Sequence, residues 1–153
     1  MENEIPTWLK IMQNGSIGEA RTRAFLLDRF WILERSVDID GADFIIQRRV
    51  TRQNLLDRNP PRFGVIQVKF FESETTTQYI PKIYVVDEKN NPRDEFFVIC
   101  HSGLEDEPKI FFLTAKTIYE DFPIVLINGI DKFRLSGSII LSSGKYLIES
   151  KKN

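Results

Sequence analysis

Four side chains in the first half of the chain have the chemistry needed to hydrolyse a phosphodiester together: Glu19, Asp43, Gln67 and Lys69. That reaction requires a divalent metal, which polarises the phosphate and lowers the pKa of an attacking water, and positive charge where negative charge builds up. Mg²⁺ takes oxygen ligands, usually including one or two carboxylates, and keeps several waters. Asp43 is therefore the first candidate metal ligand, and Lys69 is placed to orient the water or to stabilise the transition state.

Further oxygen ligands would come from groups near these two residues. Gln67 offers a neutral amide oxygen, and Val68 offers a backbone carbonyl between the two polar side chains of the same segment. Glu19 would close the site with a second carboxylate. We therefore predict a site for Mg²⁺ or Mn²⁺ formed by Asp43, Gln67, Glu19 and Val68.

A long helix is predicted to carry Glu19. Ser16 followed by Glu19 three residues later matches a capping box, which marks the start of a helix. Apolar residues then recur at helical spacing and form one face, which consists of Ile17, Ala20, Ala24, Leu27 and Trp31. The pattern predicts a helix over about 17–33, preceded by a short lead-in over 1–15. Glu19 then has an alternative role as the capping residue alone.

Two strands are predicted to carry the other candidates. Runs of β-branched and aromatic residues at 44–46 and 64–71 predict paired strands that are joined by a polar connection. A glycine in the turn before Asp43 permits a tight bend, so that this carboxylate emerges at a strand end. Gln67 and Lys69 are two residues apart and therefore point to the same face of their strand. The simpler alternatives are a turn role for the aspartate and an ordinary solvated face for the other two.

The second half of the chain predicts more strands and one helix. The strands are expected over 79–86, as an edge strand, and over 95–101 and 109–113. Thr114 is expected to cap a helix over about 115–122, which Pro123 ends. The order of these elements indicates one α/β (α+β) domain over residues 1–153, with a mixed central sheet flanked by helices.

The composition limits the class of protein. The single cysteine, Cys100, excludes an internal disulfide, and a net charge of −1 argues against nonspecific coating of nucleic acid. No apolar run approaches the roughly 20 residues of a membrane span, and the N-terminus lacks the pattern of a signal peptide. We therefore expect a cytoplasmic protein that does not associate with a membrane.

Other chemistries have less support in the sequence. His101 is the only histidine. Adjacent strand residues point to opposite faces, so Cys100 and His101 are not expected to form a nucleophilic pair, and a core or edge histidine is predicted instead. The acidic run 105–107 lacks the spacing of a calcium loop and is predicted to be a solvated turn. The phenylalanine pairs at 96–97 and 111–112 predict core packing.

Three motifs follow one another on the predicted helix and the two predicted strands. They are Glu19, the turn Asp40-Gly41-Ala42-Asp43 and the segment Gln67-Val68-Lys69. Together they resemble the PD-(D/E)XK nuclease superfamily, in its variant with glutamine at the first position of the (D/E)XK element. The phrases Gly18-Glu19-Ala20 and Gly64-Val65-Ile66-Gln67-Val68-Lys69 are more particularly similar to compact bacterial domains of the DUF4365-like group. The resemblance covers about residues 15–115.

The resemblance implies a restriction-endonuclease-like core, divalent metal binding and cleavage of nucleic acid. Asp43 and Glu19 would be the acidic metal positions, Gln67 the substituted acid and Lys69 the catalytic lysine. It implies a DNA endonuclease of bacterial defence or nucleic-acid turnover, with DNA expected ahead of RNA and a homodimer as one arrangement for cutting two strands. Because the Gln67 amide lacks the charge of an acid, the alternative is a catalytically inactive module of the same fold. Such a module would bind nucleic acid or protein, for example as a sensor or an immunity-type partner.

Overall fold

The computed structural model describes residues 6–33, 43–48, 63–103 and 107–148. Its helices are α1 (Thr7–Leu27), α2 (Lys82–Val85), α3 (Ala115–Asp121) and α4 (Gly137–Ser142). Its strands are β1 (Phe30–Leu33), β2 (Phe44–Arg48), β3 (Phe63–Phe71), β4 (Thr77–Pro81), β5 (Phe96–Ser102), β6 (Lys109–Thr114), β7 (Ile124–Ile127) and β8 (Ile130–Ser136).

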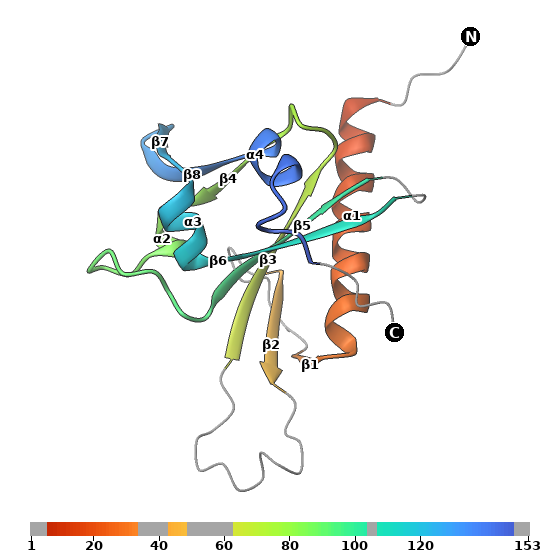
Figure 1. The fold of residues 1–153 in the computed structure, drawn as a ribbon, viewed down its shortest axis with the longest axis horizontal. Helices are drawn as coiled ribbons and strands as arrows, with labels where there is room; N and C mark the ends of the chain where they lie inside the picture. The colour runs from red at the N-terminus through yellow and green to blue at the C-terminus, as the bar shows by residue number, and fades with distance from the viewer. Residues whose placement is uncertain (1–5, 34–42, 49–62, 104–106, 149–153) are drawn as a thin grey trace, which may run out of the picture.

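The described strands form two sheets. The larger sheet has five strands in the order β1-β2-β3-β5-β6, and within it only β3 and β5 run parallel. The smaller sheet has three antiparallel strands in the order β4-β8-β7. The helix α1 runs along one face of the larger sheet, and the smaller sheet packs on the other side together with α3 and α4 (Figure 1). This arrangement confirms the predicted α/β (α+β) fold with a mixed sheet flanked by helices.

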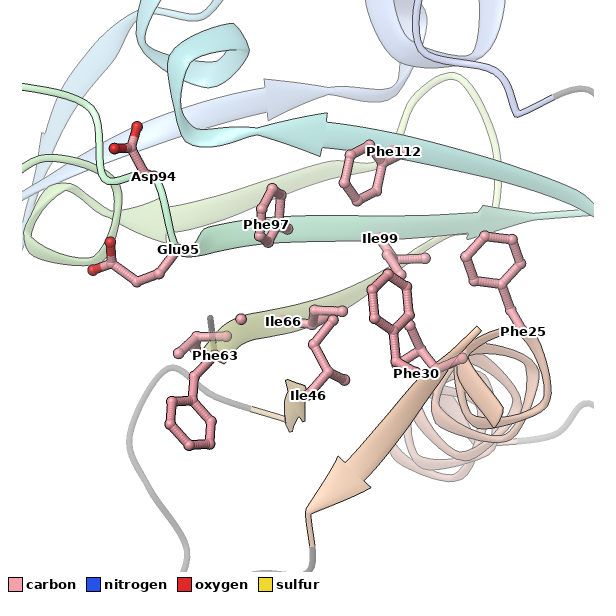
Figure 2. Close-up of a pocket in the computed structure, with 13 residues that line it drawn as sticks. Phe25, Phe30, Ile46, Phe63, Ile66, Asp94, Glu95, Phe97, Ile99 and Phe112 are labelled. Carbon is pink, nitrogen blue, oxygen red and sulfur yellow. The ribbon is translucent and has the colours of Figure 1, made fainter. Parts of the chain in front are cut away.

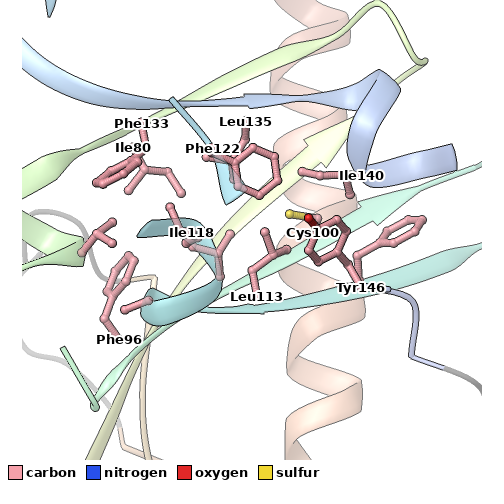
Figure 3. Close-up of a cluster of buried hydrophobic side chains, with 14 of the residues drawn as sticks. Ile80, Phe96, Cys100, Leu113, Ile118, Phe122, Phe133, Leu135, Ile140 and Tyr146 are labelled. Atoms are coloured by element: carbon pink, nitrogen blue, oxygen red, sulfur yellow. The ribbon is translucent and has the colours of Figure 1, made fainter. Parts of the chain in front are cut away.

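The central strand β3 separates two hydrophobic clusters. Ile66 and Val68 pack on the α1 side, whereas Val65 and Phe71 pack on the other side. The larger cluster on that second side joins both sheets with α3 and α4, and Figure 3 shows its side chains meeting between these elements. The predicted alternation of β3, with Gln67 and Lys69 facing away from Ile66 and Val68, is therefore confirmed. Candidate site residues on β3 thus share a face with the main core.

The predicted bounds of the first helix are wrong. α1 covers Thr7–Leu27, whereas the capping box predicted a start near Ser16. Ser16 and Glu19 lie in the middle of the helix, so the capping role of Glu19 is wrong as well. The predicted end is also wrong, because Trp31 belongs to β1, which pairs with β2.

Tertiary packing explains this longer helix. Gly18, Thr22 and Leu26 are buried against the sheet. A Cβ added at Gly18 would lie 3.2 Å from Val68 Cγ1, so the glycine lets α1 approach β3 closely. Extending the helix from this anchored half back through Gly15 costs only about 1 kcal/mol relative to alanine. The glycine at 15 therefore does not end the helix.

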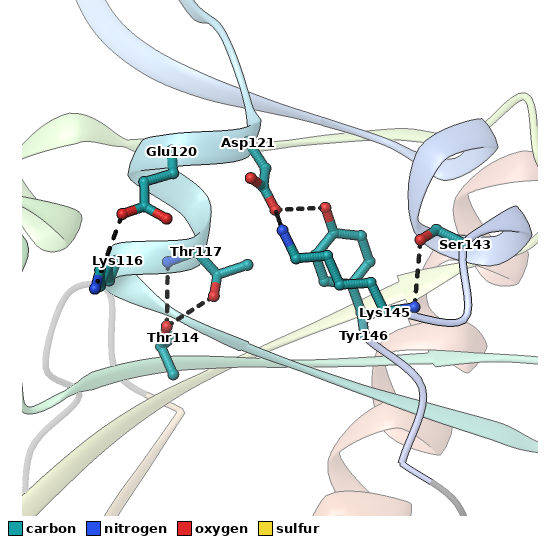
Figure 4. Close-up of polar contacts among 8 residues, drawn as sticks. All are labelled: Thr114, Lys116, Thr117, Glu120, Asp121, Ser143, Lys145 and Tyr146. Atoms are coloured by element: carbon teal, nitrogen blue, oxygen red, sulfur yellow. Dashed lines mark hydrogen bonds and ion pairs between the residues drawn. The ribbon is translucent and has the colours of Figure 1, made fainter.

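Most other predicted elements agree with the structure. β5 and β6 match the runs predicted over 95–101 and 109–113, and Thr114 caps α3 by accepting a hydrogen bond from the Thr117 N–H at 3.1 Å (Figure 4). The run predicted as one strand over 79–86 is divided at Pro81 between the edge strand β4 and the short helix α2.

The two phenylalanine pairs differ from the prediction. Phe96 and Phe111 are buried in the larger cluster, as expected for core residues. Their neighbours Phe97 and Phe112 point to the α1 side, where Phe112 remains 36% exposed. Core packing was therefore the wrong prediction for Phe112, because strand alternation gives the two members of each pair different surroundings.

The C-terminal run joins the larger sheet. The Phe112 N–H donates to the Tyr146 carbonyl at 2.9 Å. Asp121 of α3 accepts hydrogen bonds from Lys145 Nζ at 2.6 Å and from the Tyr146 hydroxyl at 2.8 Å (Figure 4). These bonds hold the segment 145–148 against β6 and α3.

Three predicted features fall wholly or partly outside the described residues. They are the turn 40–43, the connection 51–63 and the acidic run 105–107, of which only Asp43, Phe63 and Glu107 are described. The extent of the single domain over 1–153 stays a prediction.

Within the described part of the chain, no helix has both the length and the apolar character needed to cross a membrane.

Candidate functional site

Asp43 lies where β2 and β3 separate. The antiparallel register of these strands places Phe44 opposite Ile66. Immediately before β2, the Asp43 N–H donates to the Ile66 carbonyl at 2.9 Å, and Asp43 Oδ2 accepts a hydrogen bond from the Val68 N–H at 2.7 Å. The Asp43 carboxylate therefore binds a backbone N–H of β3 that lies just beyond the last residue pair of β2 and β3. A turn role does not account for this contact, because its partner lies 25 residues away in the sequence.

Gln67 lies opposite Asp43 when the same register is continued by one pair. Phe44 and Ile66 both pack on the α1 side, so their neighbours Asp43 and Gln67 belong to the other face. Gln67 Oε1 is buried and has no hydrogen-bond partner among the described residues. An unsatisfied buried acceptor costs roughly 1–3 kcal/mol. This oxygen is therefore available to a ligand that supplies a positive charge or a donor.

Lys69 completes the group on this face. Burial lowers the pKa of its ammonium below the usual 10.5, and the negative charge of Asp43 only partly offsets that effect. The ammonium is therefore within electrostatic reach of the Asp43 carboxylate, although its charged form is disfavoured by burial. The structure thus brings Asp43, Gln67 and Lys69 together where the two strands diverge.

Lys132 is a further cation that sequence reasoning missed. It lies on β8 of the smaller sheet, and its positive charge also lowers the pKa of Lys69. The sequence gives only a local signal for Lys132. This residue alternates with the buried residues Phe133 and Leu135, as expected on a half-buried strand. Nothing local indicates that β8 packs over the face of β3 that carries Lys69.

Glu19 approaches the same end of the sheet from α1. It is exposed and lies one helical turn before Arg23, whose guanidinium carbon is 5.3 Å from the centroid of the Phe44 ring. Residues four apart share one side of a helix, so Glu19 is on the β2 side of α1. Because α1 covers the opposite face of the sheet from Gln67, Glu19 can reach the other candidates only around the edge of β3 beyond Asp43.

The oxygens on this edge suit a hard divalent cation. Asp43 supplies one carboxylate and Gln67 the buried unpartnered oxygen. The carbonyl of Val68 belongs to the same edge of β3 as the N–H that binds Asp43, because both backbone groups of a strand residue point in one direction. One carboxylate, two neutral oxygens and bound waters are a ligand set that Mg²⁺ accepts. No group of three His, Cys, Asp or Glu side chains gathers at a metal-binding distance among the residues described.

On the α1 side of the sheet, His101 forms a separate buried pair with Thr22. The Thr22 hydroxyl and His101 Nε2 are 2.5 Å apart, and His101 Nδ1 is buried without a hydrogen-bond partner in the described structure. Burial, followed by the positive charge of Arg21, lowers the pKa of His101 from 6.5 to about 4. Cys100 lies in the cluster on the opposite side, which confirms that the two residues cannot act as a nucleophilic pair. The predicted core position of the histidine is confirmed.

Acidification is expected to destabilise the folded protein through His101. Between pH 6.5 and about 4 the unfolded state binds a proton that the folded state does not bind, so stability falls as the pH falls through this window. At about 1.4 kcal/mol per pKa unit the loss reaches roughly 3 kcal/mol near pH 4. Urea unfolding at a series of pH values measures it. A Thr22→Val/His101→Leu variant removes the pair and should show a shallower dependence, and an equal slope in both proteins would refute the prediction.

Comparison with known proteins found no relative of this chain. No family model, no curated protein and no solved structure matches it.

Proposed function

We propose that this protein hydrolyses phosphodiester bonds of nucleic acid with a divalent metal bound by Asp43, Gln67 and Val68. The observation that carries the proposal is the buried, unpartnered Gln67 Oε1, which lies opposite Asp43 and two residues from Lys69. A buried amide oxygen without a donor is uncommon in folded proteins and calls for a partner. A metal ion beside the Asp43 carboxylate supplies that partner, and the resemblance of the motifs around these residues to PD-(D/E)XK nucleases also supports the proposal.

Each residue has a distinct role in this proposal. Mg²⁺ or Mn²⁺ at this place would polarise the phosphate and lower the pKa of an attacking water. Asp43 holds the metal, and the Val68 N–H fixes the orientation of its carboxylate. Lys69 orients the attacking water or accepts its proton, and the lowered pKa of its ammonium makes the neutral amine easier to reach. Glu19 would add a second carboxylate from around the edge of β3.

A catalytically inactive binding module is the second candidate. It is favoured by Gln67, because an uncharged amide stands at the position of the substituted acid. Asp43 is then the carboxylate that faces Lys69. On this view the edge of β3 and the cations Lys69 and Lys132 bind nucleic acid or an acidic protein surface without cutting. The assignment of DNA ahead of RNA, the cytoplasmic location and a homodimer are further proposals that rest on the resemblance.

Nicking of supercoiled DNA tests the first proposal against the second. Purified protein in Mg²⁺ or Mn²⁺ should nick the plasmid, and EDTA should stop the reaction. Asp43→Asn keeps the shape and an acceptor for the Val68 N–H but removes the charge, so the rate should fall by at least about 100-fold. Asp131→Asn changes an exposed carboxylate on β8 and should leave the rate unchanged. A parallel assay with RNA decides the substrate, and sedimentation decides the oligomeric state.

The possible outcomes separate the two candidates. Equal cleavage by the wild type and by Asp43→Asn would show that the activity belongs to another site or to a contaminant. If the wild type does not cleave, calorimetry with Mg²⁺ is informative, because binding that disappears in Asp43→Asn supports an inactive metal-binding module. Binding of neither metal nor nucleic acid would reject the nuclease and would leave only a module that binds an acidic protein surface.

A further inference from the structure

A cavity lies on the α1 side of the larger sheet. It is a cleft of about 720 Å³ with a floor of buried aliphatic side chains that include Leu26, Ile66 and Ile99. Small-molecule sites typically measure roughly 300–1,000 Å³ and are mostly apolar, with few polar groups. The cleft is separate from the proposed metal site, because Gln67 and Lys69 point to the other face of β3.

Aromatic rings from four elements form the walls of this cleft. They are Phe25, Phe30, Phe97 and Phe112, whereas the ring of Phe63, at the end near Glu95, is turned away from them (Figure 2). Phe97 and Phe112 stack with ring centroids 5.4 Å apart. Phe112 is 36% exposed, although it lies beside a core. The walls therefore offer aromatic faces to a ligand instead of closing on one another.

Negative charge collects at one end of the cleft. The exposed carboxylates Asp94 and Glu95 line that end, where β5 begins (Figure 2). Arg93 Nη1 is 3.8 Å from Glu95, an exposed pair that contributes little and leaves one net negative charge among the three residues. The end with the carboxylates is therefore suited to a positively charged group.

The aromatic faces favour the same sign of charge. The face of a phenylalanine ring is electronegative and attracts cations. Phe25, whose ring lies at the other end of the cleft from the carboxylates (Figure 2), already carries the Arg29 guanidinium carbon 4.1 Å from its centroid. The free positive group of a ligand would thus be directed away from Arg29 and toward Asp94 and Glu95.

We infer that this cleft binds small organic cations that have an apolar body. The body lies between the phenylalanine rings, and an ammonium or guanidinium group faces Asp94 and Glu95. A ligand of the same shape with a negative charge meets repulsion at that end, and a neutral ligand gains only the apolar contact. The site does not depend on the proposed nuclease activity, since the two lie on opposite faces of the sheet.

Titration with two probes of opposite charge tests this inference. Phenethylammonium and phenylacetate share a phenyl ring on a short chain, and binding of each is followed by ¹⁵N NMR of the full chain at low salt, where exposed charges are least screened. Phenethylammonium should bind at least about tenfold more tightly than phenylacetate. In Asp94→Asn/Glu95→Gln this ratio should fall to within about twofold. The matched control Glu74→Gln/Glu88→Gln removes two exposed acids elsewhere and should preserve the ratio.

A second pair of variants tests the aromatic walls. Phe112→Ala removes a wall ring that is partly exposed, so the fold should survive, and both probes should bind about fivefold more weakly. Tyr119→Ala removes a ring that is 43% exposed on α3, outside the cleft, and should change nothing. The inference is overturned if neither probe binds at about 10 mM, a concentration that would reveal even a weak site. It is also overturned if the preference for the cation survives in Asp94→Asn/Glu95→Gln, or if the loss in Phe112→Ala is matched by Tyr119→Ala.

Discussion

Lys69→Met is expected to abolish metal-dependent cleavage of DNA and, in the same protein, to raise the midpoint of thermal unfolding. The ammonium is held partly buried with a lowered pKa, so at neutral pH its charge costs stability. Methionine has a similar shape and no charge. We expect a gain of about 1 kcal/mol, or ~2–4 °C for a chain of this length, together with a loss of activity of roughly 10²–10³-fold. Calorimetric melting and the nicking assay measure the two effects.

The stability gain in Lys69→Met should depend on pH in a defined direction. The folded state releases the Lys69 proton more readily than the unfolded state, for which the pKa is near 10.5. The cost of burying the ammonium is therefore fully present below the pKa of the folded state and diminishes as the pH rises from there toward 10.5. The difference in melting temperature between the two proteins should shrink over the same interval.

Two further variants distinguish function from structure at this position. Lys116→Met removes an ammonium from an exposed pair on α3 and should alter neither activity nor stability. Lys69→Arg keeps a positive charge but cannot become neutral, and it should remain poorly active if the amine handles a proton. A Lys69→Met protein that is both less stable and inactive would indicate a structural residue, and one that remains fully active would remove Lys69 from the proposed mechanism.

Gln67→Glu is expected to increase the affinity for Mg²⁺ and to make the stability of the protein depend on the metal. A second carboxylate opposite Asp43 adds a charged ligand to a site that otherwise supplies a neutral amide. Without metal, two like charges directly opposite on paired strands repel each other, so the variant should melt at a lower temperature than the wild type. With Mg²⁺ at about 100 times the dissociation constant, binding should return about 2.7 kcal/mol.

Calorimetric titration and melting in EDTA and in Mg²⁺ measure both consequences of Gln67→Glu. We expect the dissociation constant to fall by on the order of tenfold, and nicking at limiting Mg²⁺ to increase. Gln13→Glu introduces the same group on an exposed part of α1 and should show no metal dependence. Unchanged Mg²⁺ affinity in Gln67→Glu would mean that the Gln67 oxygen does not face a metal, which would remove the main support for the proposed function.

Local sequence patterns were sufficient for much of the central sheet and insufficient for the first helix. The alternation of β3 predicted its two faces, the apolar runs over 95–101 and 109–113 predicted the strands β5 and β6, and Thr114 correctly predicted the start of α3. The first helix failed because Asn14-Gly15 favours a break locally, whereas burial of the following turns against β3 stabilises a continuous helix. Trp31 fits the helical period equally well but lies opposite Gln47 in β1 and β2, a pairing that no local pattern indicates.

The sequence by itself indicated which residues are proposed to carry the chemistry, and it determined that Gln67 and Lys69 share one face of β3. A period of two places Gln67 and Lys69 together whatever the strand packs against, and Asp43 stands next to a run of strand formers. Only the tertiary structure decided what surrounds them. The bond from Val68 to Asp43, the nearby charge of Lys132 and the cleft on the α1 side all join segments distant in the chain. Such contacts depend on how whole sheets and helices bury their apolar faces against one another, which the order of residues within one element does not reveal.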